Sequence, residues 1–435
     1  MTTSRFLLTA TTALFAAGLL TAPARADDVP ATPAAAAPAA PAAPAAWSDN
    51  IKLGLQIEGG ITFNPQTPKT NWGQLFTDYP NTVLLNQALL TLSRDIPKDV
   101  SDWDYGFHFT GLYGSDARYT HFLGLFDYAL SGRYQLDIIE ASVSVHVPVL
   151  TNGLDVKAGL YPTPLGFETI DPSTNPFYSH SYIFNFGIPL KHSGILAILH
   201  ATDWFDVYGG LDTGMNTTFG DQAGDNNGTL AGLFGFGVTA LGGNLTITAL
   251  SHFGPENAAY GSNQPLGLTN ANHFFRYEND AYVTYKWNDK LTTTTEVNYI
   301  KDENPTIGAP EAGGIAQYVS YALNDVITLN ARGEVFRDGK GFYVASFPGN
   351  WDFVNAQSGR YTSGGIVSGI KATYGEITFG VTWKPDLPKP ISGLLIRPEI
   401  RYDTALERAS GSPQPFNNGK DNNSVTIATD IVLSF

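Results

Sequence analysis

The side chains most able to do chemistry occupy alternate positions in one segment near the C-terminus, at Arg397, Glu399, Arg401 and Asp403. The opposite parity holds large apolar residues: Leu394, Ile396, Ile400 and Tyr402. Successive side chains of a β-strand point to opposite faces, so the four charged groups would share one face. Fixed charges of both signs along a wall can orient polar solutes. The alternative is that they form salt bridges with one another and only keep the wall wet and rigid.

Other segments in which apolar and polar residues alternate also carry charged residues on the face opposite their apolar residues. Those predicted to face the same interior are Arg332, Glu334, Glu296, Lys286 and Glu376, together with Glu140, Lys157, Lys52 and Glu58. Pro398 interrupts the C-terminal group and has no backbone N–H to donate to a neighbouring strand. We therefore expect a local bulge there.

Strands must position these residues, and the hydrophobic period along the chain is indeed two. Sixteen alternating segments can be placed between Ile51 and Phe435. Connections after odd-numbered segments are predicted to span 12 to 33 residues, and those after even-numbered segments 2 to 9 residues. This sorting is typical of barrels with short periplasmic turns and long extracellular loops. We predict an all-β fold, a transmembrane up-and-down antiparallel β-barrel of about 16 strands.

The composition agrees with a wall that faces lipid. Charged residues are only 15% of the 435 residues, aromatic residues are 12%, and the net charge is −15. Lipid satisfies no backbone polar groups, so a spanning sheet must close on itself. Four tryptophans lie beside the predicted short turns, where aromatic rings mark the membrane boundary: Trp103, Trp204, Trp287 and Trp383. A wall of about 16 strands is too wide for its own side chains to fill.

The N-terminal residues have a different character from the predicted barrel. Residues 1–26 combine Arg5, an apolar stretch and an Ala-x-Ala site, as in a cleaved secretory signal peptide. Residues 27–46 are rich in alanine and proline and are expected to be an extended periplasmic spacer. The barrel is predicted to cover residues 47–435. This organisation indicates the outer membrane of a Gram-negative bacterium.

The third long connection, 162–192, is unusually aromatic and rich in proline. Such a loop would be a liability in free solvent, so we predict that it folds back into the barrel and narrows it. The residues expected to form this constriction are Glu168, Asp171, Phe177, Tyr178 and Tyr182. The alternative is that the loop packs on the outer rim or at a trimer contact.

Groups that could support catalysis or bind a metal lack a recognisable pattern. Ser179 and His180 are adjacent, but no orienting motif accompanies them. Two histidine pairs do not have the spacing of metal ligands: His192 with His200, and His252 with His273. The absence of cysteine excludes disulfides and thiolate metal sites. We expect no enzyme and no cofactor or metal; the less favoured alternative is an outer-membrane barrel hydrolase sensitive to changes at Ser179 or His180.

Several short motifs together resemble the OmpL-like β-barrel porins. They are GLYPTPLGFE at 159–168, NPFYS at 175–179, PLKHSG at 189–194, residues 87–94 and RPEIRYD at 397–403. The resemblance spans roughly residues 50–435 and implies an outer-membrane porin. The Ala/Pro-rich spacer is not part of it.

The function expected from these observations is passive diffusion of small hydrophilic solutes through a water-filled channel. The acidic balance predicts a weak cation preference and disfavours nucleic acid as a partner. A channel specific for sugars or carboxylates, with Arg397 and Arg401 as contacts, is the alternative. Expected partners are outer-membrane lipid, lipopolysaccharide and small polar solutes, and analogy with porins of this size adds a homotrimer.

Overall fold

The computed structural model describes residues 47–97, 100–127, 132–220, 224–362 and 370–435. The predicted signal peptide and the Ala/Pro-rich spacer lie outside the described residues. Residues 47–435 form one compact unit. Within its described part, no helix has both the length and the apolar character needed to cross a membrane.

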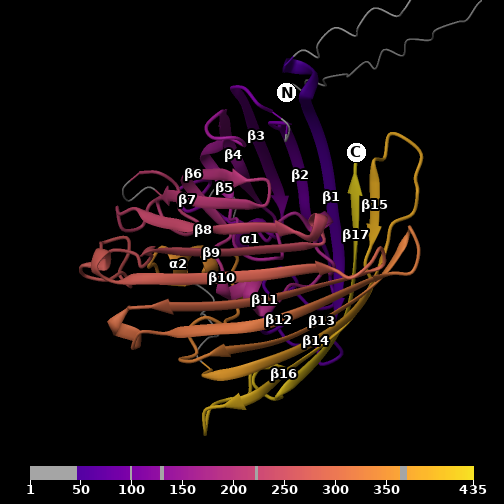
Figure 1. The fold of residues 1–435 in the computed structure, drawn as a ribbon. Helices are drawn as coiled ribbons and strands as arrows, with labels where there is room; N and C mark the ends of the chain where they lie inside the picture. Colours follow the sequence, from indigo (N-terminus) through magenta and orange to yellow (C-terminus); the bar gives the residue numbers. More distant parts are fainter. Residues whose placement is uncertain (1–46, 98–99, 128–131, 221–223, 363–369) are drawn as a thin grey trace, which may run out of the picture. The chain divides into compact units, whose positions relative to one another are not determined.

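Most of the regular secondary structure of the described chain is β-strand (Figure 1). The strands are β1 (Ile51–Phe63), β2 (Val83–Arg94), β3 (Asp104–Gly114), β4 (Gln135–Val147), β5 (Leu154–Pro162), β6 (Lys191–Thr202), β7 (Phe205–Asp212), β8 (Ala231–Ala240), β9 (Leu245–Pro255), β10 (Phe275–Lys286), β11 (Leu291–Asp302), β12 (Glu311–Ala322), β13 (Ile327–Asp338), β14 (Ala372–Trp383), β15 (Gly393–Ile396), β16 (Glu399–Arg408) and β17 (Asn423–Ser434). The helical turns are short: η1 (Trp47–Asn50), α1 (Ala117–Thr120), η2 (Pro172–Thr174), η3 (Ile183–Gly187), η4 (Leu241–Gly243), η5 (Ala271–His273), η6 (Pro305–Ile307) and α2 (Asp352–Gln357).

The sheet closes on itself. From β1 to β14 each strand pairs antiparallel with the next one in the chain, and β1 also pairs with β17, with Gly60 opposite Asp430. Figure 1 shows β1, at the indigo end of the chain, beside β17 at the yellow end. The predicted antiparallel barrel with 16 wall positions is therefore confirmed.

One wall position contains two strands, which raises the total to seventeen in the described residues. β15 and β16 both pair with β14 and with β17, and the break between them falls at Arg397 and Pro398. Proline cannot donate to the ladder, although its carbonyl still accepts from Val381 N–H at 3.0 Å. The irregularity expected at Pro398 is thus a full interruption of the strand.

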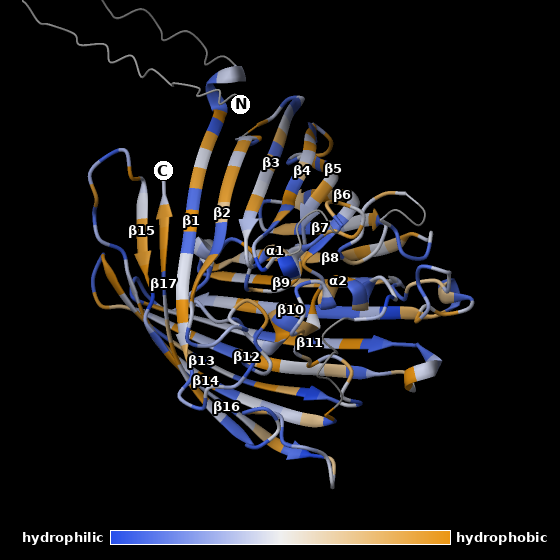
Figure 2. Ribbon diagram, turned by 180° about the vertical axis from the view of Figure 1, so that it is seen from behind, coloured by the Kyte–Doolittle hydropathy of each residue, from blue (hydrophilic) through white to orange (hydrophobic). Residues whose placement is uncertain are grey.

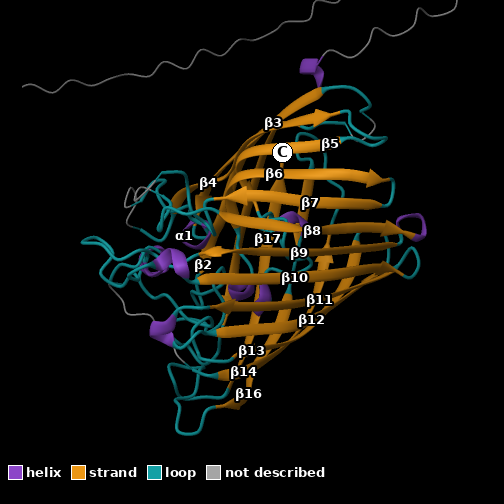
Figure 3. Cartoon of the chain, turned by 60° about the vertical axis from the view of Figure 1, so that its left-hand side comes forward, coloured by secondary structure: helices purple, strands orange, loops and turns teal. Residues whose placement is uncertain are grey.

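Long and short connections separate to opposite ends of the wall, as predicted. Figure 3 shows most of the loops and helical turns gathered at one end. One connection differs from the prediction: the loop 303–310 has eight residues, fewer than the nine of the turn 384–392. The reason is that β11 and β12 continue their pairing as far as Lys301 opposite Glu311, which shortens the loop between them.

The two faces of the wall differ in hydropathy, as the alternating colours along the strands in Figure 2 show. In β17, Val425, Ile427 and Ile431 are exposed, whereas Thr426 and Asp430 are buried. The outward face is thus apolar and suited to lipid. The four tryptophans beside the short turns are all exposed, with Trp103 at 69% and Trp383 at 44%.

The buried apolar cluster lies among the loops and the inward face of the wall. It includes Trp72 and Phe76 from the loop 64–82, Tyr119 from α1, Phe184 from the loop 163–190, and Phe347 from the loop 339–371. Ring contacts join these segments: the ring centroids of Phe76 and Phe184 are 5.5 Å apart, and those of Tyr119 and Phe347 are 6.5 Å apart. Several loops are therefore packed together rather than extended into solvent.

Candidate pore-lining site

The loop 163–190, which joins β5 to β6, crosses the interior of the barrel. Its backbone N–H groups donate to carboxylates on distant strands: Phe167 to Glu296 of β11 at 2.9 Å, Tyr178 to Glu399 of β16 at 2.9 Å, and Tyr182 to Glu334 of β13 at 2.6 Å. These strands follow one another around the wall away from β5 and β6. The loop is therefore bound to inward side chains of the wall, and its role as a constriction stays a prediction.

Arg332 of β13 fastens the loop to the wall. Its Nη1 donates to Glu168 at 2.7 Å and to the carbonyl of Ser179 at 2.8 Å, while its Nε donates to Glu376 of β14 at 2.6 Å. The guanidinium also lies 5.1 Å from the centre of the Phe177 ring. Because Arg332, Glu168 and Glu376 are all buried, each needs its partners to compensate for lost hydration.

Arg397 makes a second attachment near the break between β15 and β16. It is paired with Asp430 of β17, and its Nη1 donates to the carbonyls of Pro172 at 2.6 Å and Asn175 at 2.8 Å. Its Nη2 also reaches Glu58 of β1 at 3.3 Å. A guanidinium presents five donors in a fixed fork, which suits it to hold carboxylates and carbonyls together.

Arg401 of β16 makes the third attachment. It donates to Asp403 at 2.7 and 2.8 Å and to the carbonyl of His180 at 2.5 Å. Asp403 in turn accepts from the hydroxyl of Tyr182 at 3.0 Å. Three arginines on β13, before β16 and within β16 thus bind successive parts of one loop.

The ionisation of the loop follows from these contacts. Burial opposes the charged form of Glu168, but Arg332 and His180 outweigh it and lower the pKa of this carboxyl to about 2. Burial raises the pKa of Tyr178 and Tyr182 well above the ordinary value, so both phenols stay neutral. The docked loop therefore presents one firmly charged carboxylate and two neutral hydroxyls to the wall.

The structure places the sequence-predicted wall residues in two environments. Ten are buried in the interior: Arg397, Glu399, Arg401, Asp403, Arg332, Glu334, Glu296, Glu376, Glu140 and Glu58. Lys157 is partly exposed and Lys52 is exposed. Lys286, at the end of β10 beside a short turn, is exposed and is not brought near the loop. The contact of any of these residues with a passing solute stays a prediction.

Four of the five predicted loop residues are buried in the interior: Glu168, Phe177, Tyr178 and Tyr182. Asp171 is exposed; its carboxylate caps η2 by accepting from Ser173 N–H at 2.9 Å, and it also accepts from Gln56 Nε2 at 2.9 Å. Tyr178 donates to Asn86 of β2 at 2.9 Å. The aromatic residues thus reach the wall on both sides of the β1–β17 closure.

Sequence reasoning missed that other loops also carry buried charges. Asp78 in the loop 64–82 accepts from Arg118 at 2.9 Å, from Arg133 at 2.8 Å and from the hydroxyl of Tyr119 at 2.9 Å. These partners lie in α1 and the loop that contains it. The spacing of charges along the sequence does not indicate this pairing, because Asp78 and Arg118 are 40 positions apart.

The hydroxyl of Ser179 and the ring of His180 have separate partners. Ser179 Oγ accepts from Arg332 Nη2 at 3.3 Å, and the His180 ring stacks on Phe184 with centroids 4.0 Å apart. His180 Nδ1 lies 3.4 Å from Glu168. The adjacent Ser and His thus serve the attachment of the loop.

Two histidines that sequence spacing did not connect meet in the wall. His192 of β6 and His252 of β9 both face Asp212 of β7, with N–O distances of 3.2 and 3.0 Å. The three side chains are buried, and their donor atoms lie within 4.8 Å of one another. This is the group among the described residues whose donors could hold a metal ion.

Comparison with known proteins adds identity to this geometry. No curated protein matches the chain significantly. The structure is similar to the outer-membrane channel DcaP of Acinetobacter baumannii (TM-score 0.52, 12% identity, covering 88% of this chain and 97% of that one). It is also similar to an anion-selective porin from Comamonas acidovorans (TM-score 0.52, 11% identity, 88% and 99% covered) and to OprB of Pseudomonas putida (TM-score 0.50, 14% identity, 89% and 95% covered).

At such low identity these likenesses show the fold alone. The family assignment comes from the sequence, because residues 50–435 match the model of the family described as "Putative beta-barrel porin-2, OmpL-like". This range contains every strand of the wall and the whole loop that crosses it. The chain belongs to this family of OmpL-like β-barrel porins.

Proposed function

We propose that this porin is an outer-membrane channel for passive diffusion of small hydrophilic solutes, with a weak preference for cations. The observation that carries the proposal is the loop 163–190, held across the interior by Arg332, Arg397 and Arg401. Wall side chains alone leave a wide interior in a barrel of this size. An attached loop narrows that space and sets the size of solute that passes.

The cation preference rests on the balance of charges around the loop. Three buried arginines stand against nine buried carboxylates that contact the loop or these arginines: Glu58, Glu168, Asp280, Glu296, Glu334, Glu376, Glu399, Asp403 and Asp430. Some of these carboxylates accept from backbone N–H groups, which offset their charge without cancelling it. Fixed negative charge near a channel raises the local concentration of cations.

The alternative of a dedicated sugar or carboxylate channel gains no support from Arg397 and Arg401. Both side chains are buried, and their donors are directed to carboxylates and to carbonyls of the loop. A solute would have to displace those partners before either arginine could bind it. Assembly into a homotrimer stays a prediction, which the migration of unheated protein on a gel would test.

The proposal is tested in planar lipid bilayers with the purified full chain. We expect stepwise conductance and a reversal potential of cation-selective sign in a salt gradient. Deleting residues 168–185, which contain the attached part of the loop, should raise the single-channel conductance. A matched control deletes 262–265 from the exposed part of the loop 256–274 and should leave conductance unchanged.

Two results would contradict parts of the proposal separately. Unchanged conductance after the 168–185 deletion would refute the loop as the constriction while leaving the channel intact. Equal or anionic selectivity of the parent would refute the charge argument alone. A folded parent that shows no conductance in any bilayer would overturn the channel itself.

A further inference from the structure

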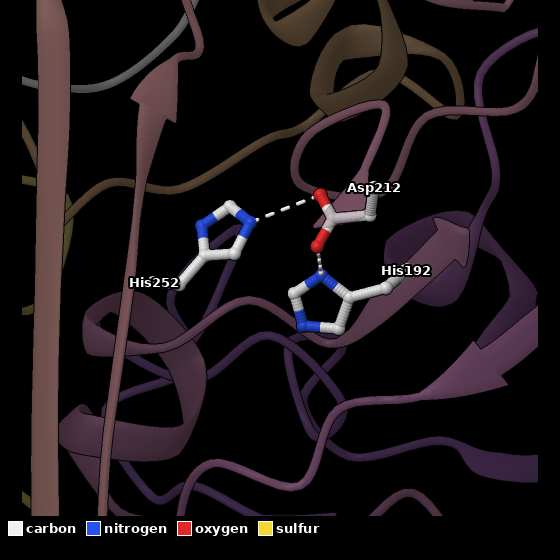
Figure 4. Close-up of side chains that lie close together, drawn as sticks. All are labelled: His192, Asp212 and His252. Atoms are coloured by element: carbon white, nitrogen blue, oxygen red, sulfur yellow. Dashed lines mark hydrogen bonds and ion pairs between the residues drawn. The ribbon is translucent and has the colours of Figure 1, made fainter. Parts of the chain in front are cut away.

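Two imidazoles and a carboxylate converge on one point of the wall near its long-loop end. Figure 4 shows His192 and His252 on either side of Asp212, each with a ring nitrogen directed at a different carboxylate oxygen. His192 is the second residue of β6, Asp212 the last of β7, and His252 lies in β9. None of the three contacts the loop attachments described above.

Small residues make this convergence possible. Asp212 pairs across the sheet with Gly194 of β6 and with Ala231 of β8. A Cβ atom at Gly194 would lie 2.6 Å from Asp212 Cα, so a larger residue there would push the carboxylate away. Ala231 lies between Asp212 and β9, which leaves His252 a path to the carboxylate across the intervening strand.

Polar atoms of His192 and Asp212 face each other in the interior without a regular hydrogen bond. His192 Nε2 lies 2.9 Å from Thr163 Oγ1, so this ring nitrogen has a polar partner outside the group, and Nδ1 is the nitrogen that faces Asp212. His192 Nδ1 and Asp212 Oδ2 are 3.2 Å apart, yet neither has a hydrogen-bond partner in the described structure. A buried ring nitrogen and a carboxylate oxygen at this distance either share a proton or bind a cation between them.

The second histidine has the outer partner expected of a metal ligand. His252 Nε2 faces Asp212 at 3.0 Å, and its Nδ1 faces Glu278 of β10 at 3.5 Å. A carboxylate behind a histidine orients the ring and strengthens it as a ligand. Both oxygens of Glu278 and one of Glu256 have no hydrogen-bond partner among the described residues, and all these side chains are at least nine-tenths buried.

The charge of the group also favours a cation. Asp212, Glu256 and Glu278 bring three carboxylates together without a paired arginine or lysine. The neighbouring Arg276 is committed to Asp302, with contacts of 3.0 and 2.8 Å. Buried carboxylates without a compensating charge are costly, and a divalent ion would supply that charge.

We propose that His192, Asp212 and His252 bind one divalent transition-metal ion, with Zn²⁺ the best match to two imidazoles and a carboxylate. Zinc bonds of about 2.0–2.2 Å in a tetrahedron put ligand atoms about 3.4 Å apart. The two N–O distances here, 3.2 and 3.0 Å, are to different oxygens of Asp212, and the three donor atoms lie within 4.8 Å of one another, so the side chains must draw together to bind the ion. The ion would tie β6, β7 and β9 together across β8.

The experiment uses the full chain, purified without a polyhistidine tag in detergent, stripped with a chelator and dialysed against Zn²⁺ alone. We expect one ion per chain. Asp212→Asn and His252→Gln should each weaken binding at least about 100-fold, because each removes one of three ligands. Replacing Zn²⁺ by Co²⁺ should give the strong visible absorption of a four-coordinate site, and Asp212→Asn should abolish it.

His273→Gln is the matched control, since His273 is exposed in the loop 256–274 and should not affect uptake. Heat-dependent migration on a gel verifies that each variant is a folded barrel, and His192→Gln replaces any variant that is not. No uptake by the parent would overturn the proposal and assign a shared proton to the group. Equal uptake by parent and Asp212→Asn would also overturn it, by locating the metal at other histidines.

Discussion

Replacing Arg332 by leucine tests directly whether buried charge holds the loop 163–190 in place. The substitution leaves Glu168 and Glu376 buried without this partner. Glu376 keeps Thr378 at 2.5 Å and Arg401 at 3.6 Å, so this wall carboxylate still has partners that compensate for its buried charge. Glu168 keeps Ser181 N–H at 2.8 Å and His180 at 3.4 Å, but both belong to the same loop, so this carboxylate regains water only when the loop leaves the interior.

The expected increase in undocking of the loop follows from this difference between Glu168 and Glu376. Removing one partner of a buried ion pair costs about 3–5 kcal/mol. Since about 1.4 kcal/mol corresponds to a tenfold change in an equilibrium, the undocked loop should become at least about 100-fold more populated. The barrel itself should stay closed, because its ladder hydrogen bonds are untouched.

The absence of cysteine makes the assay simple. Ser181 is fully buried in the docked loop, so Ser181→Cys supplies a single thiol that a charged methanethiosulfonate reagent reaches only after undocking. Adding Arg332→Leu should raise the labelling rate about 100-fold. The reagent is applied to folded protein in detergent, and labelling is followed by mass.

Arg337→Leu is the matched control because it makes the same chemical change in the same strand. Arg337 pairs with Glu407, and both side chains are exposed, so the loss should be within about 1 kcal/mol. Equal labelling rates in the Arg332 and Arg337 variants would refute the idea that buried charge docks the loop. Labelling of Ser181→Cys at the rate of a free peptide would refute docking altogether.

Two further predictions concern the same loop. The pKa of Glu168, lowered to about 2 because Arg332 outweighs the effect of burial, lies below the ordinary 4.5; its contribution to docking is therefore complete above pH 4.5 and lost as the pH falls through about 2. Conductance should hold steady down to pH 4.5 and rise only toward pH 2, and a rise already at pH 6 would contradict this assignment. A Cβ at Gly60 would lie 2.6 Å from the Tyr178 ring and 2.8 Å from the carbonyl oxygen of Thr429 in β17, so Gly60→Ala should destabilise the barrel with its docked loop by about 1–3 kcal/mol, seen as a lower midpoint of thermal unfolding. Gly54→Ala, with open space around its Cβ, is the control, and equal midpoints would contradict the packing argument.

The wall could be predicted from sequence because the bilayer imposes a strict rule on it. Lipid on one face and polar groups on the other produce a period of two that no tertiary detail can override. The same rule predicted that Glu399 and Asp403 face inward, because they alternate with apolar residues that face the lipid. The interruption at Arg397 and Pro398 was only half predicted, since a proline signals a lost hydrogen bond but not how far the break extends.

The partners inside the barrel could not be predicted in the same way. Glu168 and Arg332 are 164 positions apart, and the pairing depends on how far the loop reaches around the wall. Aromatic content indicated burial of the loop but not which carboxylates accept from it. Likewise, His192 of β6 and His252 of β9 come together because β7 and β8 lie between their strands and place both residues at the same level of the wall. Sequence spacing pairs His192 with His200 and His252 with His273, which are closer in sequence, and so did not predict this contact.

The reach of the loop has a consequence for the order of assembly. Its partners Glu296, Glu334 and Glu399 lie 129 to 221 positions later in the chain, so no partial barrel that lacks β11 to β16 can hold the loop. Contacts of such large sequence separation form late, after the intervening chain is ordered. Until then its tyrosines and phenylalanines stay unprotected, which makes aggregation a hazard of the unfinished barrel. Docking of the loop can thus serve as the final step of maturation, one that only a closed wall permits.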